Sequence, residues 1–243
     1  MRRQLKAEAV VSTLEKLRAR IAERFAGAGL AAVAADLVET ARTSAQRARA
    51  IGRPYLLLRA VIFVLALAGA AIVYWAIIHM HWSQLIHGDL LAESQGLESS
   101  VNLLLLLAAG IWFLMTAEQR LKRGRVLKDL HELRAFAHVV DMHQLTKDPT
   151  IILAAPSTRT TSSPKREMTR FQLTRYLEYC AELLALIGKL AALYGERTPD
   201  TEVLSAINDV EDLCTSLGRK IWQKITILSA LEDDSATTAG AKT

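Results

Sequence analysis

Histidines with nearby carboxylates are the first residues in this sequence whose types and spacing could support chemistry. His79 and His81 form a His-x-His pair, His87 follows, and Asp89 and Glu93 lie close by. Imidazole and carboxylate groups are ligands that Zn²⁺ or Cu²⁺ accept, so a metal site is one interpretation. Histidine is also an ordinary amphipathic residue at a membrane interface, and we favour that interpretation.

A second histidine cluster comprises His131, His138, Asp141 and His143. His131 and His138 are seven residues apart and share one helix face, with Asp141 one turn beyond His138. Asp141 could orient His138 for proton transfer or ligation, whereas His143 is rotated away. We favour ordinary polar residues of a helix over a catalytic pair.

Beyond these histidines, the sequence contains few motifs that indicate a catalytic or binding site. It contains no nucleotide-binding glycine-rich loop, nucleophile elbow or potassium-filter motif. The segment GRKIWQKI places Arg219, Lys220 and Lys224 around Trp222, which could touch anionic headgroups, although a solvated basic face is the preferred interpretation. We expect no catalytic activity and no cofactor.

Composition indicates what surrounds these residues. The chain of 243 residues is 51% hydrophobic with a mean hydropathy of +0.19, yet 23% of its residues are charged. Apolar residues concentrated in membrane spans, with charges outside them, explain this mixture. The net charge of +5 has no nucleic-acid recognition motif beside it, so we expect no nucleic-acid partner.

Two apolar runs predict a transmembrane hairpin. The first covers about 55–80 and the second about 98–117, at the short end of the length that crosses a bilayer, with an external loop at 81–97. Ala66, Gly69 and Ala70, facing 108–110 on the other run, would let the two helices approach closely.

The distribution of charge predicts the orientation of this hairpin. No Lys or Arg lies between Met80 and Ala117, whereas both flanks, 42–53 and 120–128, are rich in them. Positive flanks stay in the cytoplasm, so both termini are expected there. The residues expected at the membrane interface are long or aromatic: Arg59, Tyr74, Trp75, Trp82 and Trp112.

The N-terminal segment 1–53 predicts two cytoplasmic amphipathic helices that break near Gly27 and Gly29. Leu14, Leu17, Ile21 and Phe25 form one apolar stripe. The stripe either lies on the membrane or packs against another helix; we favour packing because acidic residues accompany it.

Beyond the hairpin, the sequence predicts an extension helix at 119–148, a flexible proline-containing linker at 149–166 and a disordered tail at 233–243. The extension carries an apolar stripe of Leu127, Leu130, Leu133, Ala137 and Val140.

The segment 167–232 predicts an antiparallel, coiled-coil-like helical hairpin. Gly195 ends its first helix, and Thr198 caps the second with Pro199 at the first helical position. Apolar residues at spacings of three and four form its core. They are Leu173, Leu177, Cys180, Leu184, Ile187, Ile207, Val210, Cys214, Leu217 and Ile221.

The two cysteines of this hairpin are expected at the same level. Cys180 lies 15 residues before Gly195, and Cys214 lies 15 residues after Pro199. Such a pair could form a redox switch or part of a metal site, but cysteine in an apolar seam more often behaves as a small hydrophobe.

The second half of the chain also resembles a family of uncharacterised bacterial two-span membrane proteins. The resemblance is carried by HVVDMHQLTKDP (138–149), RYLEYCAELLALIGKLAALYG (175–195) and GRKIWQKI (218–225). It implies a bacterial inner-membrane setting and a structured cytoplasmic half, and it transfers no catalytic residue.

These patterns together predict an all-α membrane protein. The hypothesis that we favour is a membrane-anchored helical scaffold or interaction protein that forms a homo-oligomer, with the lipid bilayer and a cytoplasmic protein as partners. The alternative is a subunit of a small oligomeric ion channel or transporter, with Asn102 of the second span along its pore.

Overall fold

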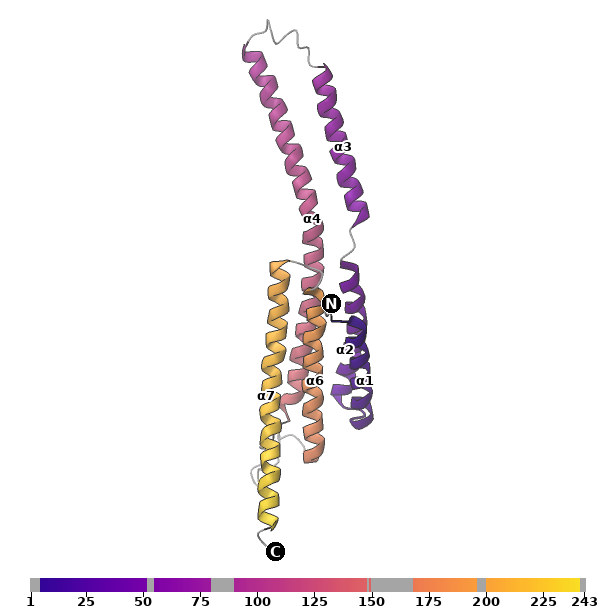
Figure 1. Ribbon diagram of the computed structural model, residues 1–243, viewed down its shortest axis with the longest axis vertical. Coiled ribbons are helices and arrows are strands. Elements are labelled where there is room, and N and C mark those ends of the chain that lie inside the picture. The colour runs from indigo at the N-terminus through magenta and orange to yellow at the C-terminus, as the bar shows by residue number, and fades with distance from the viewer. Residues whose placement is uncertain are drawn as a thin grey trace, which may run out of the picture. The chain divides into compact units, whose positions relative to one another are not determined.

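A computed structural model describes residues 5–51, 55–79, 90–147, 149, 168–195 and 200–240. For residues 51, 58, 76, 77, 79, 90–100, 103 and 231–240 it describes the helical backbone only. Over these ranges the chain forms six α-helices and no strand (Figure 1). The prediction of an all-α protein is therefore confirmed.

The helices divide between two compact units. The first unit comprises residues 1–52 and 126–243, and the second comprises residues 53–125. The boundary after Arg125 falls inside one helix, so the two segments of that helix belong to different units.

The first unit begins with α1 (Ala7–Arg24) and α2 (Gly29–Ile51), which pack against each other (Figure 1). The chain turns between them at Gly27, whose φ of 77° lies in the left-handed region that glycine adopts without steric cost. Leu14, Leu17, Ile21 and Phe25 are all buried, and α1 also contacts α6. The apolar stripe thus packs against protein, as favoured from the sequence.

The C-terminal helices of the first unit are α6 (Arg170–Gly195) and α7 (Thr201–Gly240). They make the most extensive helix–helix contact, and α6 also packs against α1 and α2. All ten residues expected in the core of this hairpin are buried, from Leu173 on α6 to Ile221 on α7. They join one apolar cluster with the buried residues of α1, α2 and α4.

The N-terminal ends of α6 and α7 are capped by side chains. At α6, Thr169 Oγ1 accepts from the backbone N–H of Gln172, while Gln172 Oε1 accepts from that of Thr169, which is a capping box. At α7, Asp200 Oδ1 accepts from the backbone N–H groups of Glu202 and Val203.

The expected cap at Thr198 with Pro199 in the first helical position is therefore wrong, because α7 begins two residues later. Aspartate is among the strongest N-cap residues, since its carboxylate satisfies two otherwise unpaired N–H groups and complements the helix dipole.

Helix α4 (Leu90–Leu145) is longer than either segment expected from the sequence. It begins within the expected external loop at 81–97, because LLAESQGL consists largely of good helix formers and contains no proline. The segment of α4 in the first unit contributes Leu130, Leu133, Ala137 and Val140 to the core, joined by Val126, whereas Leu127 is only half-buried.

Helix α7 also extends further than expected. It continues through Gly240, so residues 233–240 are helical where we expected a disordered tail. No proline lies in this stretch to stop the helix. The expected linker at 149–166 lies outside the described residues, apart from Pro149.

The second unit contains α3 (Leu56–His79) and the segment of α4 up to Arg125. Gly69 of α3 meets the side chain of Leu107, so closely that an added Cβ would lie 2.5 Å from a Leu107 methyl group. Gly110 has open space at the corresponding position. The close approach expected at 108–110 therefore occurs at Leu107, where a large side chain fills the space over glycine.

Candidate functional site

The second unit exposes an apolar surface that is unusual for a protein surrounded by water. Large side chains are exposed on both helices, including Leu57 (84%), Phe63 (65%), Leu105 (64%) and Trp112 (73%). Contiguous apolar surface of this extent marks a lipid or protein contact.

By length and composition, one helix in the described part of the chain qualifies as a membrane span. Its candidate segment is Leu104–Leu145, and the apolar window within it has no buried residue. The apolar stretch Arg59–Trp75 of α3 is shorter.

The residues expected at a membrane interface are exposed wherever their side chains are described. Tyr74 and Trp75 are 67% and 63% exposed, and Arg59 extends from the first turn of α3. Trp82 lies outside the described residues.

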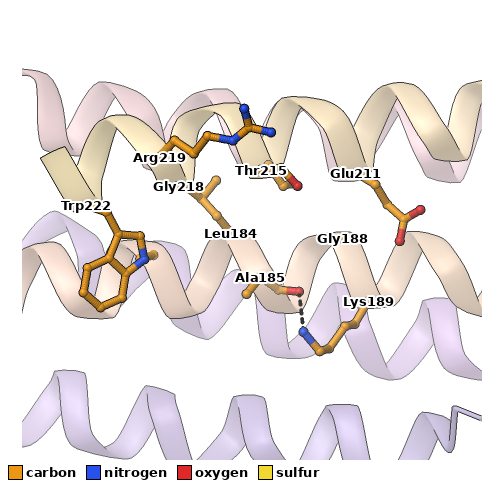
Figure 2. Close-up of a pocket in the computed structure, with 11 residues that line it drawn as sticks. Leu184, Ala185, Gly188, Lys189, Glu211, Thr215, Gly218, Arg219 and Trp222 are labelled. Atoms are coloured by element: carbon orange, nitrogen blue, oxygen red, sulfur yellow. Dashed lines mark hydrogen bonds between the residues drawn. The ribbon is translucent and has the colours of Figure 1, made fainter.

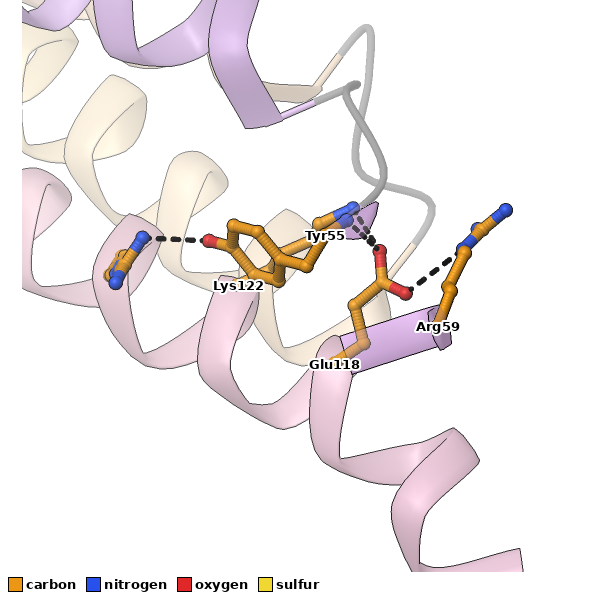
Figure 3. A network of polar contacts seen from close by, with 5 residues as sticks. Tyr55, Arg59, Glu118 and Lys122 are labelled. Carbon is orange, nitrogen blue, oxygen red and sulfur yellow. Dashed lines mark hydrogen bonds and ion pairs between the residues drawn. The ribbon is translucent and has the colours of Figure 1, made fainter. Parts of the chain in front are cut away.

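A polar network lies at the start of α3 and just beyond the expected second span (Figure 3). Glu118 is its centre: its carboxylate accepts from Lys122 Nζ at 2.7 Å, from Arg59 Nε at 3.3 Å and from the backbone N–H of Tyr55 at 3.3 Å. Arg125 donates to the Tyr55 hydroxyl at 2.7 Å, and the Lys122 and Arg125 cations lie over the Tyr55 ring.

The charges of this network explain why Glu118 is tolerated in a buried position. The hydrogen bond from Lys122 holds the pKa of the Glu118 carboxyl below its usual value, and the bonds from Tyr55 and Arg59 act in the same direction. Burial opposes them. The carboxylate is consequently ionised. It links the start of α3, through Tyr55 and Arg59, to the interior of α4, where Lys122 is its partner. Sequence reasoning singled out Arg59 alone, because the pairing joins residues far apart in the chain.

The proposed metal ligands are not tested by the described residues. Helix α3 ends at His79, whose side chain is not described, and His81 and His87 lie outside the described residues. Among the side chains that are described, no group of three or more His, Cys, Asp or Glu residues is arranged to hold a metal ion.

The three histidines near the end of α4 lie in two environments. His131 and His138 are exposed, whereas His143 lies against Gly29 at the start of α2. Asp141 accepts from Gln144 Nε2 at 2.5 Å and has no described hydrogen bond to a histidine. This arrangement agrees with ordinary polar residues on a helix.

The expected alignment of the two cysteines is wrong. Cys214 lies opposite Gly188, with the Cβ position of Gly188 3.9 Å from Cys214 Cβ, and Gly195 lies opposite Ile207. The expected alignment counted residues from Gly195 and Pro199, and so assumed that the end of α6 and the start of α7 lie at the same level. The start of α7 instead extends beyond the end of α6, because Gly195 lies opposite Ile207. Cys180 consequently lies nearer the level of Trp222, about two turns away from Cys214.

Both thiols are free and buried. Burial raises the pKa of Cys180 to about 12 and that of Cys214 to about 11. The thiolate forms that a redox switch needs are therefore scarce at neutral pH, which agrees with cysteine acting as a small hydrophobe.

The first unit carries a groove of about 400 Å³ between α6 and α7, which we call the α6/α7 groove (Figure 2). Trp222 lies at one end, and Glu211 and Lys189 lie at the other. Small residues make up much of its lining. The lining residues are Ala181, Leu184, Ala185, Gly188, Lys189, Glu211, Cys214, Thr215, Gly218, Arg219 and Trp222.

A buried polar network joins three helices of the first unit. Asp129 of α4 accepts from the Tyr194 hydroxyl of α6 at 2.9 Å and pairs with Arg47 of α2 at 2.6 Å, while Ser44 also hydrogen-bonds to Tyr194. Burial raises the pKa of Tyr194, so its hydroxyl stays protonated and donates. Sequence reasoning missed this network. Its signal was the position of Asp129, three residues after Val126 and four before Leu133, which puts a carboxylate on the apolar face of the helix.

The basic segment 218–225, in the middle of α7, divides between two environments. Lys224 is half-buried and donates to the backbone oxygen and Oε1 of Gln144, at 3.1 and 2.6 Å, near the C-terminal end of α4. Arg219 and Lys220 are exposed. Lys224 is therefore a bundle residue, and only Arg219 and Lys220 form the exposed basic face.

Comparison with known proteins assigns no relative to this arrangement. No protein family, curated protein or solved structure shows significant similarity to the chain.

Proposed function

We propose that this chain is a bacterial inner-membrane protein that crosses the bilayer twice and acts as an oligomeric, membrane-anchored helical scaffold without catalytic activity. The observation that carries the proposal is the contrast within the molecule: the second unit exposes large apolar side chains on both helices, whereas the first unit buries them in a bundle.

Lipid explains the exposed surface better than a second protein does. On α3 the three consecutive residues Phe63, Val64 and Leu65 are all exposed, so the exposed apolar surface extends over about 200° of the helix circumference, as expected for a helix that contacts hydrocarbon. A protein contact would cover one stripe. The shorter apolar stretch of α3 becomes a span when its flanking residues are included.

The network around Glu118 supports an interface at this end of the hairpin. Charged groups beside a span avoid hydrocarbon, and Arg59 reaches the Glu118 carboxylate from the first turn of α3. Lys122 and Arg125 would then face the cytoplasm with the rest of the positive flanks, which supports cytoplasmic termini.

The scaffold role is supported by the construction of the first unit. Its core is closed by apolar residues from all of its helices, and its α6/α7 groove is open. A rigid helical bundle with an open helix-lined groove is suited to holding a partner at the membrane.

The membrane anchor is tested by matched arginine substitutions. Leu106→Arg places a charge on the exposed apolar segment of α4, and Leu204→Arg places one on an exposed position of α7. An arginine in the centre of a span costs about 2.5–3.5 kcal/mol on insertion scales, so Leu106→Arg should deplete the protein from alkali-washed membranes. Leu204→Arg should not. Equal retention of both variants would contradict the anchor.

The scaffold and the channel alternative differ in ion flux. Purified protein in liposomes should give no ion flux above that of empty liposomes if it is a scaffold. A flux that Asn102→Leu abolishes would contradict the scaffold and support the channel.

A further inference from the structure

The start of α3 and the segment 118–125 of α4, both in the second unit, carry an excess of positive charge. Glu118 is the single acidic residue in the sequence ranges 55–79 and 101–125. The same ranges contain five basic residues, which are Arg59, Arg120, Lys122, Arg123 and Arg125. One carboxylate cannot neutralise five cations, so this part of the molecule attracts anions.

The carboxylate of Glu118 is already engaged by three donors. It accepts from Lys122, from Arg59 and from the backbone N–H of Tyr55. Arg125, by contrast, is exposed, and its described hydrogen bond goes to the neutral hydroxyl of Tyr55. Among the described residues, Arg125 has no carboxylate partner. Its charge is therefore available to an anion from outside the chain.

The cations of Lys122 and Arg125 converge on the side chain of Tyr55 (Figure 3). Lys122 Nζ lies 5.2 Å and Arg125 Cζ 5.5 Å from the centre of the Tyr55 ring. The Tyr55 hydroxyl accepts from Arg125 at 2.7 Å, and its own hydrogen has no described acceptor. A hydroxyl can donate as well as accept, and a guanidinium carries five N–H groups. Donors of Tyr55 and Arg125 therefore remain, side by side, for the oxygens of one anion.

Exposed apolar surface adjoins this cluster on both helices. Leu56 and Leu57 directly follow Tyr55 and are 75% and 84% exposed, and Phe113 and Met115 of α4 are 61% and 60% exposed. The phosphates of a bilayer lie just outside its hydrocarbon, within a headgroup region of about 5–8 Å in each leaflet. If lipid covers the apolar surface, the Tyr55 hydroxyl and the guanidinium bonded to it lie at the level of these phosphates.

We propose that Tyr55 and Arg125, with Lys122 beside them, bind the phosphate of an anionic phospholipid. The Tyr55 hydroxyl and the remaining N–H groups of Arg125 donate to phosphate oxygens, and Lys122 adds positive potential. The acyl chains lie along the exposed leucines that follow Tyr55. A zwitterionic lipid fits less well, because the excess cations repel its own ammonium group. The inference rests on the proposed membrane anchor and names the class of lipid that it selects.

Equilibrium binding of radiolabelled lipid to the purified, immobilised full-length protein in detergent tests the site. The wild type should bind phosphatidylglycerol more tightly than phosphatidylcholine with the same acyl chains. Arg125→Gln removes one cation and its donors, so the affinity for phosphatidylglycerol should fall about fivefold, with little change for phosphatidylcholine. Arg134→Gln makes the same change at an exposed position nine residues further along α4 and should alter neither affinity.

The hydroxyl of Tyr55 is tested separately from the charge. Tyr55→Phe keeps the ring beneath the two cations but removes the proposed donor, so the affinity for phosphatidylglycerol should again fall about fivefold. Tyr74→Phe removes an exposed hydroxyl near the other end of α3 and is the matched control. If the two variants bind phosphatidylglycerol equally well, Tyr55 is not a ligand and the proposed site is wrong.

Inorganic phosphate distinguishes a lipid headgroup from a soluble phosphate compound. Millimolar phosphate, added at constant ionic strength, should leave phosphatidylglycerol bound, because it offers the same oxygens without acyl chains. Displacement of the lipid under these conditions would overturn the assignment to lipid. So would equal affinity of the wild type for the two lipids, or equal affinity of Arg125→Gln and Arg134→Gln for phosphatidylglycerol.

The outcomes separate this inference from the proposed function. Circular dichroism without added lipid should be the same for every variant and the wild type; if Arg125→Gln fails to fold, the two-lipid comparison and Tyr55→Phe still decide. Arg125→Gln should stay in alkali-washed membranes, since the apolar segments are unchanged. Loss of lipid preference with retention in washed membranes overturns this inference alone, whereas release of the wild type from washed membranes overturns the anchor.

Discussion

The two units of this chain contain the same kinds of apolar side chain, but the first unit buries them and the second exposes them. Leu14, Leu133 and Leu177 of the first unit have no exposed surface, whereas Leu57 and Leu105 of the second are 84% and 64% exposed. Both arrangements come from helices rich in leucine. The difference teaches that helix formation and burial are separate: the first unit buries apolar surface against itself, and we propose that the second buries it in lipid.

The largest effect that tests this contrast is expected from truncating a buried leucine. Leu177→Ala should lower the free energy of unfolding of the bundle by about 2–5 kcal/mol, because it removes apolar contacts and leaves a cavity. Leu105→Ala, which removes the same atoms from the exposed surface, should change it by less than about 0.5 kcal/mol. Denaturant unfolding in detergent, followed by circular dichroism, measures both, and similar losses would break the contrast.

A smaller loss is expected from the buried polar network. Tyr194→Phe removes the hydroxyl that donates to Asp129, leaving that carboxylate with Arg47 as its remaining partner. The bundle should lose about 1–3 kcal/mol in the same unfolding measurement. Tyr74→Phe removes an exposed hydroxyl from α3 and is the matched control. A Tyr194→Phe variant as stable as the control would show that the network contributes nothing.

Removing the N-cap of α7 should lower the free energy of unfolding by about 1 kcal/mol. Asp200→Ala removes the acceptor for the N–H groups of Glu202 and Val203, and losing an N-cap typically costs about 0.5–2 kcal/mol. Thr198→Ala should be close to neutral, since Asp200 is the cap. Thermal unfolding of the two variants distinguishes them. The opposite ranking would restore the helix start expected from the sequence.

The smallest effect belongs to the polar network of the second unit. The pKa of Glu118 is lowered in the folded state, so its contribution to stability is present above the ordinary pKa near 4.5 and is lost as pH falls through the lowered value. The contribution should be at most about 1 kcal/mol because the side chain of Arg59, one of its partners, is largely exposed and water screens that ion pair. As the pH falls from about 7 to about 3, the melting temperature of the wild type should fall further than that of the Glu118→Gln variant, which thermal unfolding measures. Parallel pH profiles would contradict the role of the carboxylate.

Local periodicity was sufficient to predict the cores of the helices. The spacing of Leu173, Leu177 and Leu184 requires one apolar stripe on a helix, and all three residues are buried. The break at Gly27 was equally local, because only the residue type and its neighbours decide it.

Features that depend on distant residues could not be predicted in this way. The pairing of Asp129 with Tyr194 joins residues 65 positions apart, and the register that opposes Cys214 to Gly188 depends on where α7 begins relative to the end of α6. The Glu118 network similarly joins residues from two helices. Each requires knowledge of how helices pack, which spacing within one helix does not contain.

Labelling with a membrane-impermeant maleimide in intact cells tests the central claim most directly. In a chain without Cys180 and Cys214, Ser94→Cys lies near the start of α4, whereas Ser12→Cys and Ser229→Cys lie on exposed positions of α1 and α7. Two spans with cytoplasmic termini predict labelling of Ser94→Cys in intact cells, and of the other two variants only after the membrane is permeabilised. Equal labelling of all three before and after permeabilisation, or protection of Ser94→Cys alone, would contradict the account.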